Sequence, residues 1–487
     1  MLGDIKPFRM IGNIYYVGTR KGTCHMIDTG EGLLLIDTGY VETGDVIVES
    51  IETLGFDPKT VRWILLSHGH YDHVGSVKQL VALSGAKVYL HEADMQYLRP
   101  ELNADFTPDV LLHGGETLRF GSVEVFCLAS PGHTDGTLSF FFDVTENGKT
   151  YRAAMFGGSG TNQLKKTYFR KKKNNVLSYL QRGRFFETTR RLRQEHVDVV
   201  LGNHVWQNRM MEKYEKSLVS AENPFIDPDE WGKYMDQVDA KLEEVIRTES
   251  RTEFVNYAHR GASEYYPENM LLSFSAGISM GANGIETDVR PTKDGVLILF
   301  HDKTPERLFG VPEVSIADMT YAELLALSAE KNGHTDRILT FEQFLQLFGW
   351  RDLQFAIELK ASGIAAEVAA LLHKYDMRMK TTVTSFSLDN LREMKACAPE
   401  FRCGWLCKEV TDETEQTMLE LGLEEICPRA SQVTAERVQA WHRKGFNVRA
   451  WGVDSDETMK NVYDSLADGM TVNFPDRLDA YIREKAE

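Results

Sequence analysis

The chain has no run of about eighteen or more apolar residues, so the sequence predicts no membrane-spanning helix. Its beginning lacks a basic stretch followed by an apolar one, so no signal peptide is expected. The six cysteines include no Cys-x-x-Cys pair and no spacing typical of a disulfide framework. Free, mostly buried thiols in a reducing, cytoplasmic setting are therefore expected.

Basic residues are outnumbered by acidic ones, 55 to 72, and the formal net charge of −17 argues against nucleic acid as a partner. One segment runs against this balance. Residues 165–193 hold eleven Lys or Arg and one acid, Glu187, with Lys171-Lys172-Lys173 at the centre. Such a segment could attract an anionic substrate, make weak contact with a lipid surface, or simply be a solvated loop and helix face.

The 487 residues exceed what one hydrophobic core usually organises, so more than one domain is expected. Residues 1–220 read as short strands with Gly-rich turns, followed by strands that alternate with helices. This pattern predicts a layered α+β domain. The predicted strands are Ile14–Val17, Cys24–Ile27, Leu33–Ile36, Val61–Ser67, Lys87–Leu90, Val123–Leu128, Leu138–Phe142 and Val197–Leu201.

A Pro-containing break at 223–228 ends this domain and opens a linker over residues 221–253. Within the linker, apolar residues recur at alternating spacings of four and three, which predicts a helix with one buried stripe that docks between domains. The stripe consists of Trp231, Met235, Val238, Leu242 and Val245.

Residues 254–487 repeat a pattern of strand, loop and amphipathic helix. Eight such units in this length predict a (β/α)8 barrel. The predicted strands are Phe254–His259, Gly284–Val289, Phe355–Leu359, Thr381–Thr384, Arg402–Leu406, Glu425–Pro428, Asn447–Val453 and Met470–Phe474. The apolar run Leu297–His301 follows too closely for a crossover, so it is expected to return as an antiparallel hairpin arm. Paired positions summing to about 587 would place His301 opposite Glu286.

Several predicted barrel strands end in polar residues, where the chemistry of such barrels is located. Glu286, Asp288 and Glu358 would repel one another if they were buried together, and a hard cation such as Mg²⁺ or Ca²⁺ resolves that conflict. His259 and His301 beside such a site could act as general acid and base. Nearby Arg260 and Lys360 would suit a phosphate, so the sequence predicts metal-assisted phosphoryl chemistry.

Together these motifs resemble the glycerophosphodiester phosphodiesterase family over residues 254–487. The resemblance rests on His259-Arg260-Gly261, Pro267-Glu268-Asn269, Glu286-x-Asp288, His301-Asp302 and Glu358-x-Lys360, with Ser385-Phe386 and Trp451 near later strand ends. It implies that Glu286, Asp288 and Glu358 bind the metal, that His259 and His301 form the acid–base pair, and that Arg260 and Lys360 contact phosphate. It also implies that Trp451 lines the glycerol or alcohol side of the substrate site. Met270 and Val472-Asn473 depart from the family's usual Thr and Thr-Asp.

The N-terminal half carries its own candidate metal residues at strand-to-loop junctions. Five histidines and an aspartate suit Zn²⁺, although iron or manganese would also accept neutral imidazoles. These residues are His68, His70, Asp72, His73, His133 and His204. Together with Leu35-Ile36-Asp37-Thr38-Gly39, they resemble the metallo-β-lactamase fold superfamily over residues 1 to about 220. The resemblance implies an αββα sandwich with one site of His68, His70 and His133 and a second of Asp72, His73 and His204.

Gly158 departs from that resemblance, because the superfamily's hydrolases usually have a metal-bridging Asp at this position. The site could therefore hold one ion or two, and Asp135 is a conceivable but unfavoured substitute. The leading hypothesis is a hydrolase that cleaves glycerophosphodiesters in its barrel, with a second metallohydrolase domain of unknown substrate. The alternatives are a lysophospholipase D-like enzyme at a lipid surface, and an N-terminal domain that only binds or dimerises.

Overall fold

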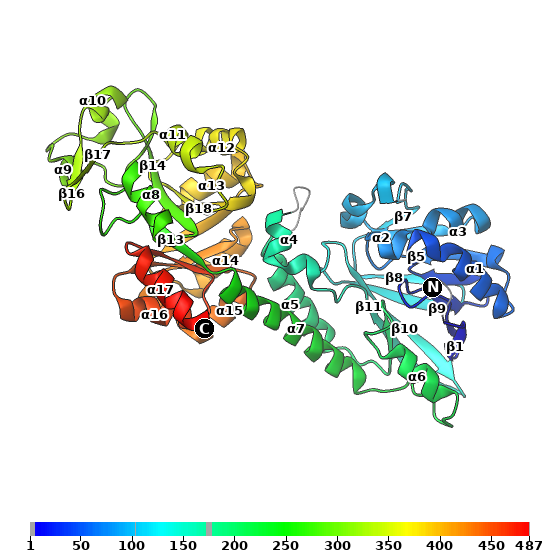
Figure 1. Ribbon diagram of the computed structural model, residues 1–487. Coiled ribbons are helices and arrows are strands. Elements are labelled where there is room, and N and C mark those ends of the chain that lie inside the picture. The colour runs from blue at the N-terminus through cyan, green and yellow to red at the C-terminus, as the bar shows by residue number, and fades with distance from the viewer. Residues whose placement is uncertain (1–4, 103, 172–177, 487) are drawn as a thin grey trace. The chain divides into compact units, whose positions relative to one another are not determined.

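The computed structural model describes residues 5–102, 104–171 and 178–486 (Figure 1). The chain divides into two compact units. The N-terminal unit comprises Met1–Leu164 and Gln181–Glu243, and the barrel unit comprises Lys165–Leu180 and Glu244–Glu487. The chain therefore passes between the units three times, the last time within helix α7 (Glu230–Thr252). The domain limits at 220 and 253 stay predictions.

The N-terminal unit contains two sheets. The first is ordered β1-β2-β3-β4-β5-β6-β7 and the second β12-β11-β10-β9-β8. In the first sheet β4 to β7 pair in parallel, which directs the ends of β5 and β6 to one edge. The strands are β1 (Phe8–Ile11), β2 (Ile14–Tyr16), β3 (His25–Asp28), β4 (Leu33–Ile36), β5 (Val61–Leu65), β6 (Lys87–His91), β7 (Val110–Leu112), β8 (Glu116–Phe120), β9 (Val123–Ala129), β10 (Leu138–Glu146), β11 (Lys149–Phe156) and β12 (Val199–Gly202).

Alternation along β4 shows how the layers are packed. Leu34 and Ile36 belong to a core shared with residues of the second sheet, such as Phe140, whereas Leu33 and Leu35 face the opposite way. Helices α1 (Gly44–Thr53) and α3 (Val77–Ser84) cover that outer face. On the second sheet, α5 (Gln181–Leu192) and the first part of α7 supply Phe185 and Trp231 against Phe156 and Phe141. The αββα prediction is confirmed.

The first strand, β1, was not predicted, nor were the short strands β7 and β8. Two short helices, α2 (Tyr71–Val74) and α6 (Met210–Ser217), complete this unit. The stripe predicted for α7 is buried at Trp231, Met235, Val238 and Leu242, but the next buried apolar residue is Ile246 rather than Val245. The difference arises because a 3.6-residue repeat drifts away from a strict four-three spacing.

The barrel unit is a closed ring of eight parallel strands in the order β13-β23-β22-β21-β20-β19-β18-β14, closed by pairing of β13 with β14. The predicted barrel is confirmed, and every predicted strand lies within two residues of its observed bounds. The strands are β13 (Val255–His259), β14 (Gly284–Pro291), β18 (Gln354–Leu359), β19 (Thr381–Ser385), β20 (Arg402–Cys407), β21 (Glu425–Pro428), β22 (Asn447–Val453) and β23 (Gly469–Val472).

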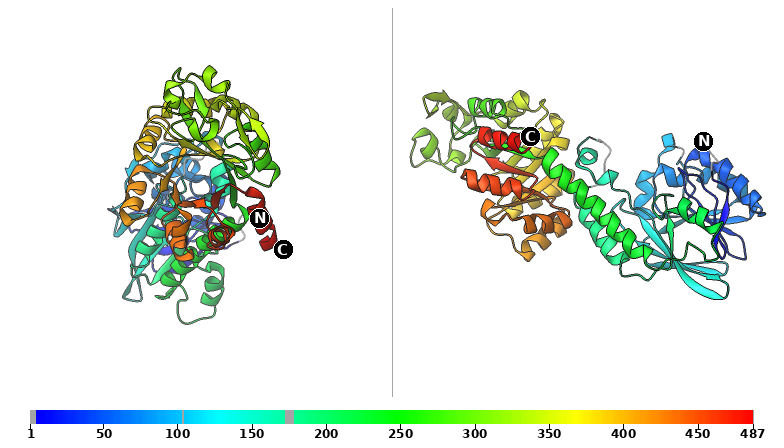
Figure 2. Two further views of the ribbon diagram at one scale, coloured as in Figure 1. Left: turned by 90° about the vertical axis from the view of Figure 1, so that its left-hand side faces the viewer. Right: turned by 60° about the horizontal axis from the view of Figure 1, so that its bottom comes forward.

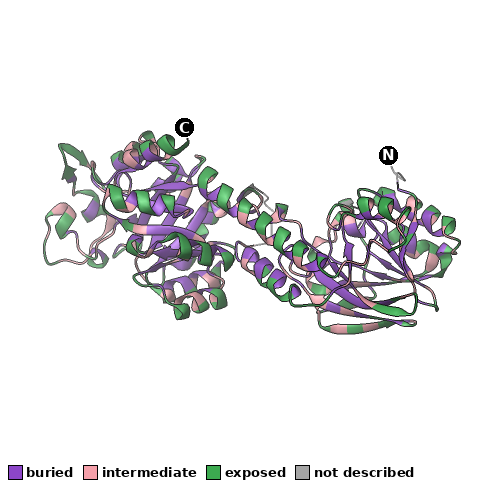
Figure 3. Ribbon diagram, turned by 90° about the horizontal axis from the view of Figure 1, so that it is seen from below, coloured by how far each residue is buried: buried purple, intermediate pink, exposed green. Residues whose placement is uncertain are grey.

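Helices surround the strands, and their outer faces are exposed while the strands are buried (Figures 2 and 3). They are α8 (Leu271–Ser279), α11 (Phe341–Phe348), α12 (Ala365–Lys374), α13 (Leu388–Cys397), α14 (Asp412–Leu421), α15 (Ala435–Arg443), α16 (Asp456–Asp464) and α17 (Pro475–Ala486). The short helices α9 (Glu306–Phe309) and α10 (Tyr321–Leu325) instead pack in a separate apolar cluster with Ile298 and Phe300. A small hairpin of β16 (Ala329–Lys331) and β17 (His334–Asp336) precedes α11.

Strand β15 (Leu297–Leu299) pairs antiparallel with β14, so the expected hairpin arm is present. Val289 pairs with Leu299, which makes the paired positions sum to 588 rather than 587. His301 therefore extrapolates to a position opposite Thr287, one residue from the predicted partner. Phe300 donates its amide hydrogen to the Asp288 carbonyl at 3.0 Å, and this bond fixes His301 at the same end of the ring as the carboxylates.

Part of the basic segment belongs to the barrel unit. Helix α4 (Lys166–Lys171) begins with a buried lysine whose Nζ lies 2.5 Å from Asp468 Oδ1. Farther along the segment, Arg184 pairs with Asp135 and Arg190 with Glu187. Much of the predicted excess of positive charge is therefore neutralised internally. Two of the three central lysines, at 172 and 173, lie outside the described residues.

All six cysteines are free, and only Cys397 is exposed. No helix among the described residues combines the length and apolar character needed to cross a bilayer.

Candidate active and metal sites

Three carboxylates from two neighbouring barrel strands converge at the mouth of the ring. Glu286 and Asp288 are two residues apart on β14 and point to the same side, and Glu358 lies beside Asp288 in the register of β18. One oxygen from each carboxylate lies within 4.8 Å of the others, and all three residues are buried. Glu286 and Glu358 border a cavity of about 340 Å³ whose wall also includes both predicted histidines.

Asp288 is surrounded by hydrogen-bond donors and cations. Its Oδ2 accepts a hydrogen bond from Asn269 Nδ2 at 2.9 Å and lies 3.0 Å from Arg260 Nε, while Oδ1 lies 3.1 Å from Lys360 Nζ. Burial alone would raise the pKa of this carboxyl, but Arg260 and Lys360 outweigh burial and hold the pKa well below its ordinary range. Asp288 is therefore a fixed negative charge at the centre of the site.

The two glutamates are less well compensated. Burial, reinforced by the neighbouring Asp288 charge, raises the pKa of Glu286 to about 8. Burial also raises the pKa of Glu358 to about 7, although Lys360 Nζ lies 2.7 Å from its Oε1. Glu286 Oε2 is buried without a hydrogen-bond partner. An oxygen-rich cluster with an unsatisfied carboxylate suits a hard divalent cation, so these three residues could hold Mg²⁺ or Ca²⁺.

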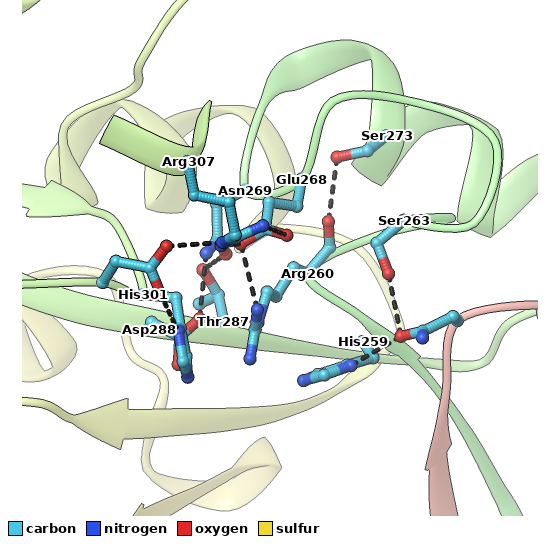
Figure 4. Close-up of polar contacts among 12 residues, drawn as sticks. His259, Arg260, Ser263, Glu268, Asn269, Ser273, Thr287, Asp288, His301 and Arg307 are labelled. Carbon is cyan, nitrogen blue, oxygen red and sulfur yellow. Dashed lines mark hydrogen bonds and ion pairs between the residues drawn. The ribbon is translucent and has the colours of Figure 1, made fainter. Parts of the chain in front are cut away.

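The two histidines are oriented by different partners (Figure 4). His259 Nδ1 lies 2.6 Å from Asn473 Oδ1, a neutral acceptor, so this nitrogen carries the proton and Nε2 is left as a base. Nε2 lies 3.8 Å from Glu286 Oε2. His301 Nδ1 instead lies 2.6 Å from the carboxylate of Asp302. Burial lowers the pKa of both imidazoles, that of His259 to about 3.

Arg260 and Lys360, predicted to contact phosphate, are ion-paired within the cluster. Arg260 NH1 donates a hydrogen bond to Glu268 Oε1 at 3.0 Å, and Arg307 NH1 in turn donates one to Glu268 Oε2 at 2.9 Å (Figure 4). Arg260 has a φ of +55° in the turn before Gly261, and its side chain reaches Asp288 on β14. Trp451 lines the cavity, and its Nε1 donates hydrogen bonds to the Cys407 and Cys427 carbonyls.

Sequence reasoning missed four residues that organise this mouth. Asn269 and Glu268 lay within a quoted motif but were given no role, and Arg307 was not singled out. Asn473 was noted only as a departure from the family's usual residue. In the structure, its side-chain oxygen accepts hydrogen bonds from His259 and from Ser263 Oγ at 2.9 Å. The feature of the sequence that could have indicated this role is the position of Asn473 directly after β23, at the end of a strand.

A second candidate centre lies at one edge of the two N-terminal sheets. It draws residues from the loop after β5, the loop between β9 and β10, and the loop after β12. The ligand atoms of each predicted set lie within 4.8 Å of one another; the sets are His68, His70 and His133, and Asp72, His73 and His204. Leu138 N donates a hydrogen bond to Ser67 O at 2.8 Å, which joins the edges of the two sheets beside the cluster.

Contacts outside the cluster select the ring nitrogens that face inward. His133 Nδ1 lies 2.8 Å from the Gly160 carbonyl and His73 Nδ1 lies 2.8 Å from Asp37 Oδ2, so the Nε2 atom of each is free to act as a ligand. His68 Nδ1 contacts Ser67 Oγ at 3.1 Å, and its Nε2 is buried without a hydrogen-bond partner. His70 Nδ1 lies 3.1 Å from His133 Nε2, a separation consistent with two ligands of one ion.

Burial is the main reason that the pKa of His68 lies well below its ordinary value, and it lowers the pKa of His133 and of His204 to about 4. These rings are therefore neutral, as metal ligands must be, and a Zn²⁺ ion fits the nitrogen-rich set.

Gly158 adjoins this cluster with no room for a larger residue. A Cβ there would lie 2.8 Å from His133 Cβ and 2.9 Å from Thr137 Cγ2. A bridging Asp at this position would therefore require His133 to move. Asp135 does not replace it, because its Oδ1 accepts hydrogen bonds from Gln181 Nε2 at 2.9 Å and Arg184 NH1 at 2.8 Å.

The geometry thus defines a barrel with a carboxylate–histidine mouth joined to a sandwich with a histidine-rich edge. Comparison with known proteins agrees. Residues 259–477 match the model of the glycerophosphoryl diester phosphodiesterase family, and residues 17–145 match the metallo-beta-lactamase superfamily. The chain is 30% identical over 236 residues to a glycerophosphodiester phosphodiesterase of Caldanaerobacter subterraneus. This match covers 47% of this chain and 97% of the relative.

The N-terminal part is 31% identical over 129 residues to a hydroxyacylglutathione hydrolase of Serratia proteamaculans, of which the chain spans 42%. The subclass B3 metallo-beta-lactamase BJP-1 of Bradyrhizobium japonicum matches with a TM-score of 0.46 and 25% identity, covering 50% of this chain and 94% of that protein. The chain belongs to the glycerophosphodiester phosphodiesterase family through its C-terminal half, and it carries a metallo-beta-lactamase domain in its N-terminal half.

Proposed function

We propose that the barrel unit hydrolyses glycerophosphodiesters to glycerol 3-phosphate and an alcohol with the help of a divalent cation. The observation that supports this most is the carboxylate cluster of Glu286, Asp288 and Glu358, which has two cationic side chains among its members. Such a cluster can hold a hard cation while the cations receive a phosphate. Bound Mg²⁺ or Ca²⁺ would supply positive charge that polarises the phosphoryl group.

The acid–base roles follow from the partners of the two histidines. His259 is neutral and its Nδ1 proton is held by an amide oxygen, so Nε2 can take the proton from the 2-hydroxyl of the glycerol as that oxygen attacks phosphorus. Asp302 faces His301 and stabilises its protonated form. His301 therefore gives a proton to the departing alcohol oxygen as the bond from phosphorus to that oxygen breaks.

The second half of the reaction reverses these roles. His301 takes a proton from water as the water oxygen bonds to phosphorus, and His259 returns a proton to the 2-hydroxyl as the cyclic phosphate opens. Arg260 and Lys360 hold the phosphoryl oxygens through both halves, since their ion pairs with Asp288 place them at one position beside the cluster.

For the N-terminal unit we propose a second metallohydrolase site that takes Zn²⁺, with the two triads holding one ion or two. The oriented ring nitrogens and the unpaired His68 Nε2 support this reading. A module that only binds or dimerises remains the alternative, and it predicts no activity from these residues.

A lysophospholipase D-like activity at a lipid surface is less favoured, because several cationic side chains of the basic segment form ion pairs within the protein. Lys166 is buried against Asp468, and Arg184 and Arg190 pair with neighbouring acids. The cavity of about 340 Å³ is also near the lower limit of ligand pockets, which suits a small diester.

The test is hydrolysis of a panel of glycerophosphodiesters by chelator-treated protein resupplied with Mg²⁺, Ca²⁺ or Zn²⁺. Release of glycerol 3-phosphate with Mg²⁺ or Ca²⁺ is expected, and Glu286→Gln should lower kcat at least a hundredfold. Glu330→Gln, on the exposed β16–β17 hairpin, is the matched control and should leave kcat unchanged. Lack of diester hydrolysis with any of the three metals would contradict the proposal.

A further inference from the structure

The cavity at the barrel mouth has a second wall that the chemistry described above does not use. Because the ring is ordered β13-β23-β22-β21-β20-β19-β18-β14, strand β21 lies opposite β14 and β22 lies opposite β18. The loops after β21 and β22 therefore face the carboxylate cluster across the mouth. They contribute Arg429 and Asp454 to the cavity wall, with Trp451 between them in the sequence.

Both charged residues are exposed, and neither has a hydrogen-bond or ion-pair partner for its side chain among the described residues. Arg260 and Lys360 on the opposite wall already form ion pairs with the acids of the cluster, so Arg429 is not needed to balance its charge. An unpaired cation and an unpaired anion on one cavity wall provide separate binding points for a ligand that carries both charges.

Trp451 gives this wall a fixed platform. Its Nε1 hydrogen bonds to the Cys407 and Cys427 carbonyls, 3.2 and 3.1 Å away, hold the ring between the ends of β20 and β21. The ring of Phe386 meets it edge-on at 5.0 Å, and Arg429 pairs with Trp451 through a parallel backbone bridge. The Arg429 side chain also runs close to Gly452, where a Cβ would lie 3.5 Å from its Cγ. An ordered aromatic face beside both charges suits an ammonium group.

We propose that Arg429, Asp454 and Trp451 form the subsite for the leaving alcohol, and that this subsite selects an alcohol bearing both a carboxylate and an ammonium group. Arg429 binds the carboxylate, and Asp454 with the face of Trp451 binds the ammonium. The inference rests on the proposed phosphodiesterase function, since it assigns the substrate class of the same cavity. His301, the proton donor to the departing oxygen, lines the same cavity, so that oxygen can face His301 while the charged groups of the alcohol extend to the wall at the ends of β21 and β22.

The experiment compares kcat/KM for glycerophosphoserine, glycerophosphoethanolamine and glycerophosphoglycerol. The wild type should prefer the serine diester over the glycerol diester by about tenfold, the size of a charge-assisted hydrogen bond. Arg429→Gln should lower kcat/KM about three- to tenfold for the serine diester alone. Asp454→Asn should lower it for the serine and ethanolamine diesters and spare the glycerol diester.

Lys408→Gln and Glu409→Gln are the matched controls, because these exposed residues follow β20 at the same end of the barrel and do not line the cavity. Neither should change the ranking of substrates. Equal losses on all three diesters in the Arg429 and Asp454 variants would overturn the inference, since the two residues would then contact the shared glycerophosphate. Unchanged kinetics in both variants would overturn it as well. A wild type inactive on all three diesters would instead refute the underlying function.

Discussion

The buried acids of the barrel and those beside the N-terminal histidine cluster are stabilised in opposite ways. In the barrel, buried acids face cations: Asp288 lies beside Arg260 and Lys360, and Asp468 beside Lys166. In the N-terminal unit, the buried Asp37 accepts hydrogen bonds from the amide and hydroxyl of Ser67 and contacts His73. Asp94 is likewise held by the Gly69 and Gly136 amides and the Thr134 hydroxyl.

This difference shows what each site can bind. At the barrel mouth, acidic and cationic side chains hold one another in place. A hard cation can therefore bind to the carboxylates and a phosphate to the cationic side chains. Hydrogen bonds from the His133 ring to the Gly160 carbonyl and from the His73 ring to Asp37 fix the tautomers and leave ring nitrogens pointing at one region, which suits zinc. The same chain thus presents an oxygen-based centre and a nitrogen-based centre, and the following predictions test that division.

The largest expected effect is on the barrel histidines. His259→Ala should lower kcat for a glycerophosphodiester by about a hundred- to ten-thousandfold, because a positioned base is lost. The exposed His196→Ala is the control. Steady-state kinetics gives the result, and a loss below threefold would show that His259 is not the base.

Removing the buried negative charge of Asp468, which directly precedes β23 at the end of the barrel away from the carboxylate cluster, should destabilise the fold. Burial would raise the pKa of Asp468, but Lys166 and His442 outweigh burial and hold that pKa well below its ordinary value. Asp468→Asn should lower the free energy of unfolding at pH 7 by about 3–5 kcal/mol, as for breaking a buried ion pair. The exposed Asp389→Asn, which removes a surface pair with Arg392, should change it by less than about 1 kcal/mol.

The loss of unfolding free energy in Asp468→Asn should depend on pH. A carboxyl whose pKa is lower in the folded state contributes stability above its unfolded value of about 3.9, and that stability is lost as the pH falls. The difference in unfolding free energy between wild type and Asp468→Asn should therefore narrow as the pH drops below about 4. Denaturant unfolding at several pH values measures it, and a gap that widens on acidification would be the wrong sign.

A smaller effect is expected at the sandwich edge. Gly158→Ala places a Cβ 2.8 Å from His133 Cβ, so that ring must shift. Zinc affinity should fall about ten- to a hundredfold, the range seen when a ligand histidine loses its orientation. Diester hydrolysis in the barrel should be unchanged. Gly232→Ala, at a glycine of α7 whose Cβ would meet no atom within 4 Å and whose φ is not positive, controls for substitution at glycine.

The smallest effect tests the orientation of His259. Asn473→Ala should lower kcat about fivefold with little change in KM, the size of one neutral hydrogen bond. Asn473→Asp keeps an acceptor for the Nδ1 proton and should retain more activity. Ser263→Ala removes only the other donor to Asn473 and serves as the control. A change confined to KM would indicate substrate contact instead.

The periodic features of the sequence were sufficient to predict the barrel and its strands. Strands β21 and β22 have the predicted bounds, because buried parallel strands read as short apolar runs between helices. The hairpin arm was predicted from a connection too short for a crossover, yet its register differs by one residue, since the turn centre cannot be read from composition.

What escaped prediction depends on long-range contacts. The assignment of Lys165–Leu180 to the barrel unit rests on Lys166 reaching Asp468, about three hundred positions away in sequence, and no local pattern encodes that pair. The orienting role of Asn473 likewise required the geometry of β13 beside β23. Both metal-ligand sets were named from the sequence because each residue lies at a strand end, although their roles stay predictions.

The most direct measurement is a paired comparison of Glu286→Gln and His68→Ala for both metal content and release of glycerol 3-phosphate. Glu286→Gln should lose the phosphodiesterase activity and keep its bound transition metal. His68→Ala should lose the transition metal and keep the activity. Loss of glycerol 3-phosphate release in His68→Ala, with release retained in Glu286→Gln, would contradict the assignment of the two sites.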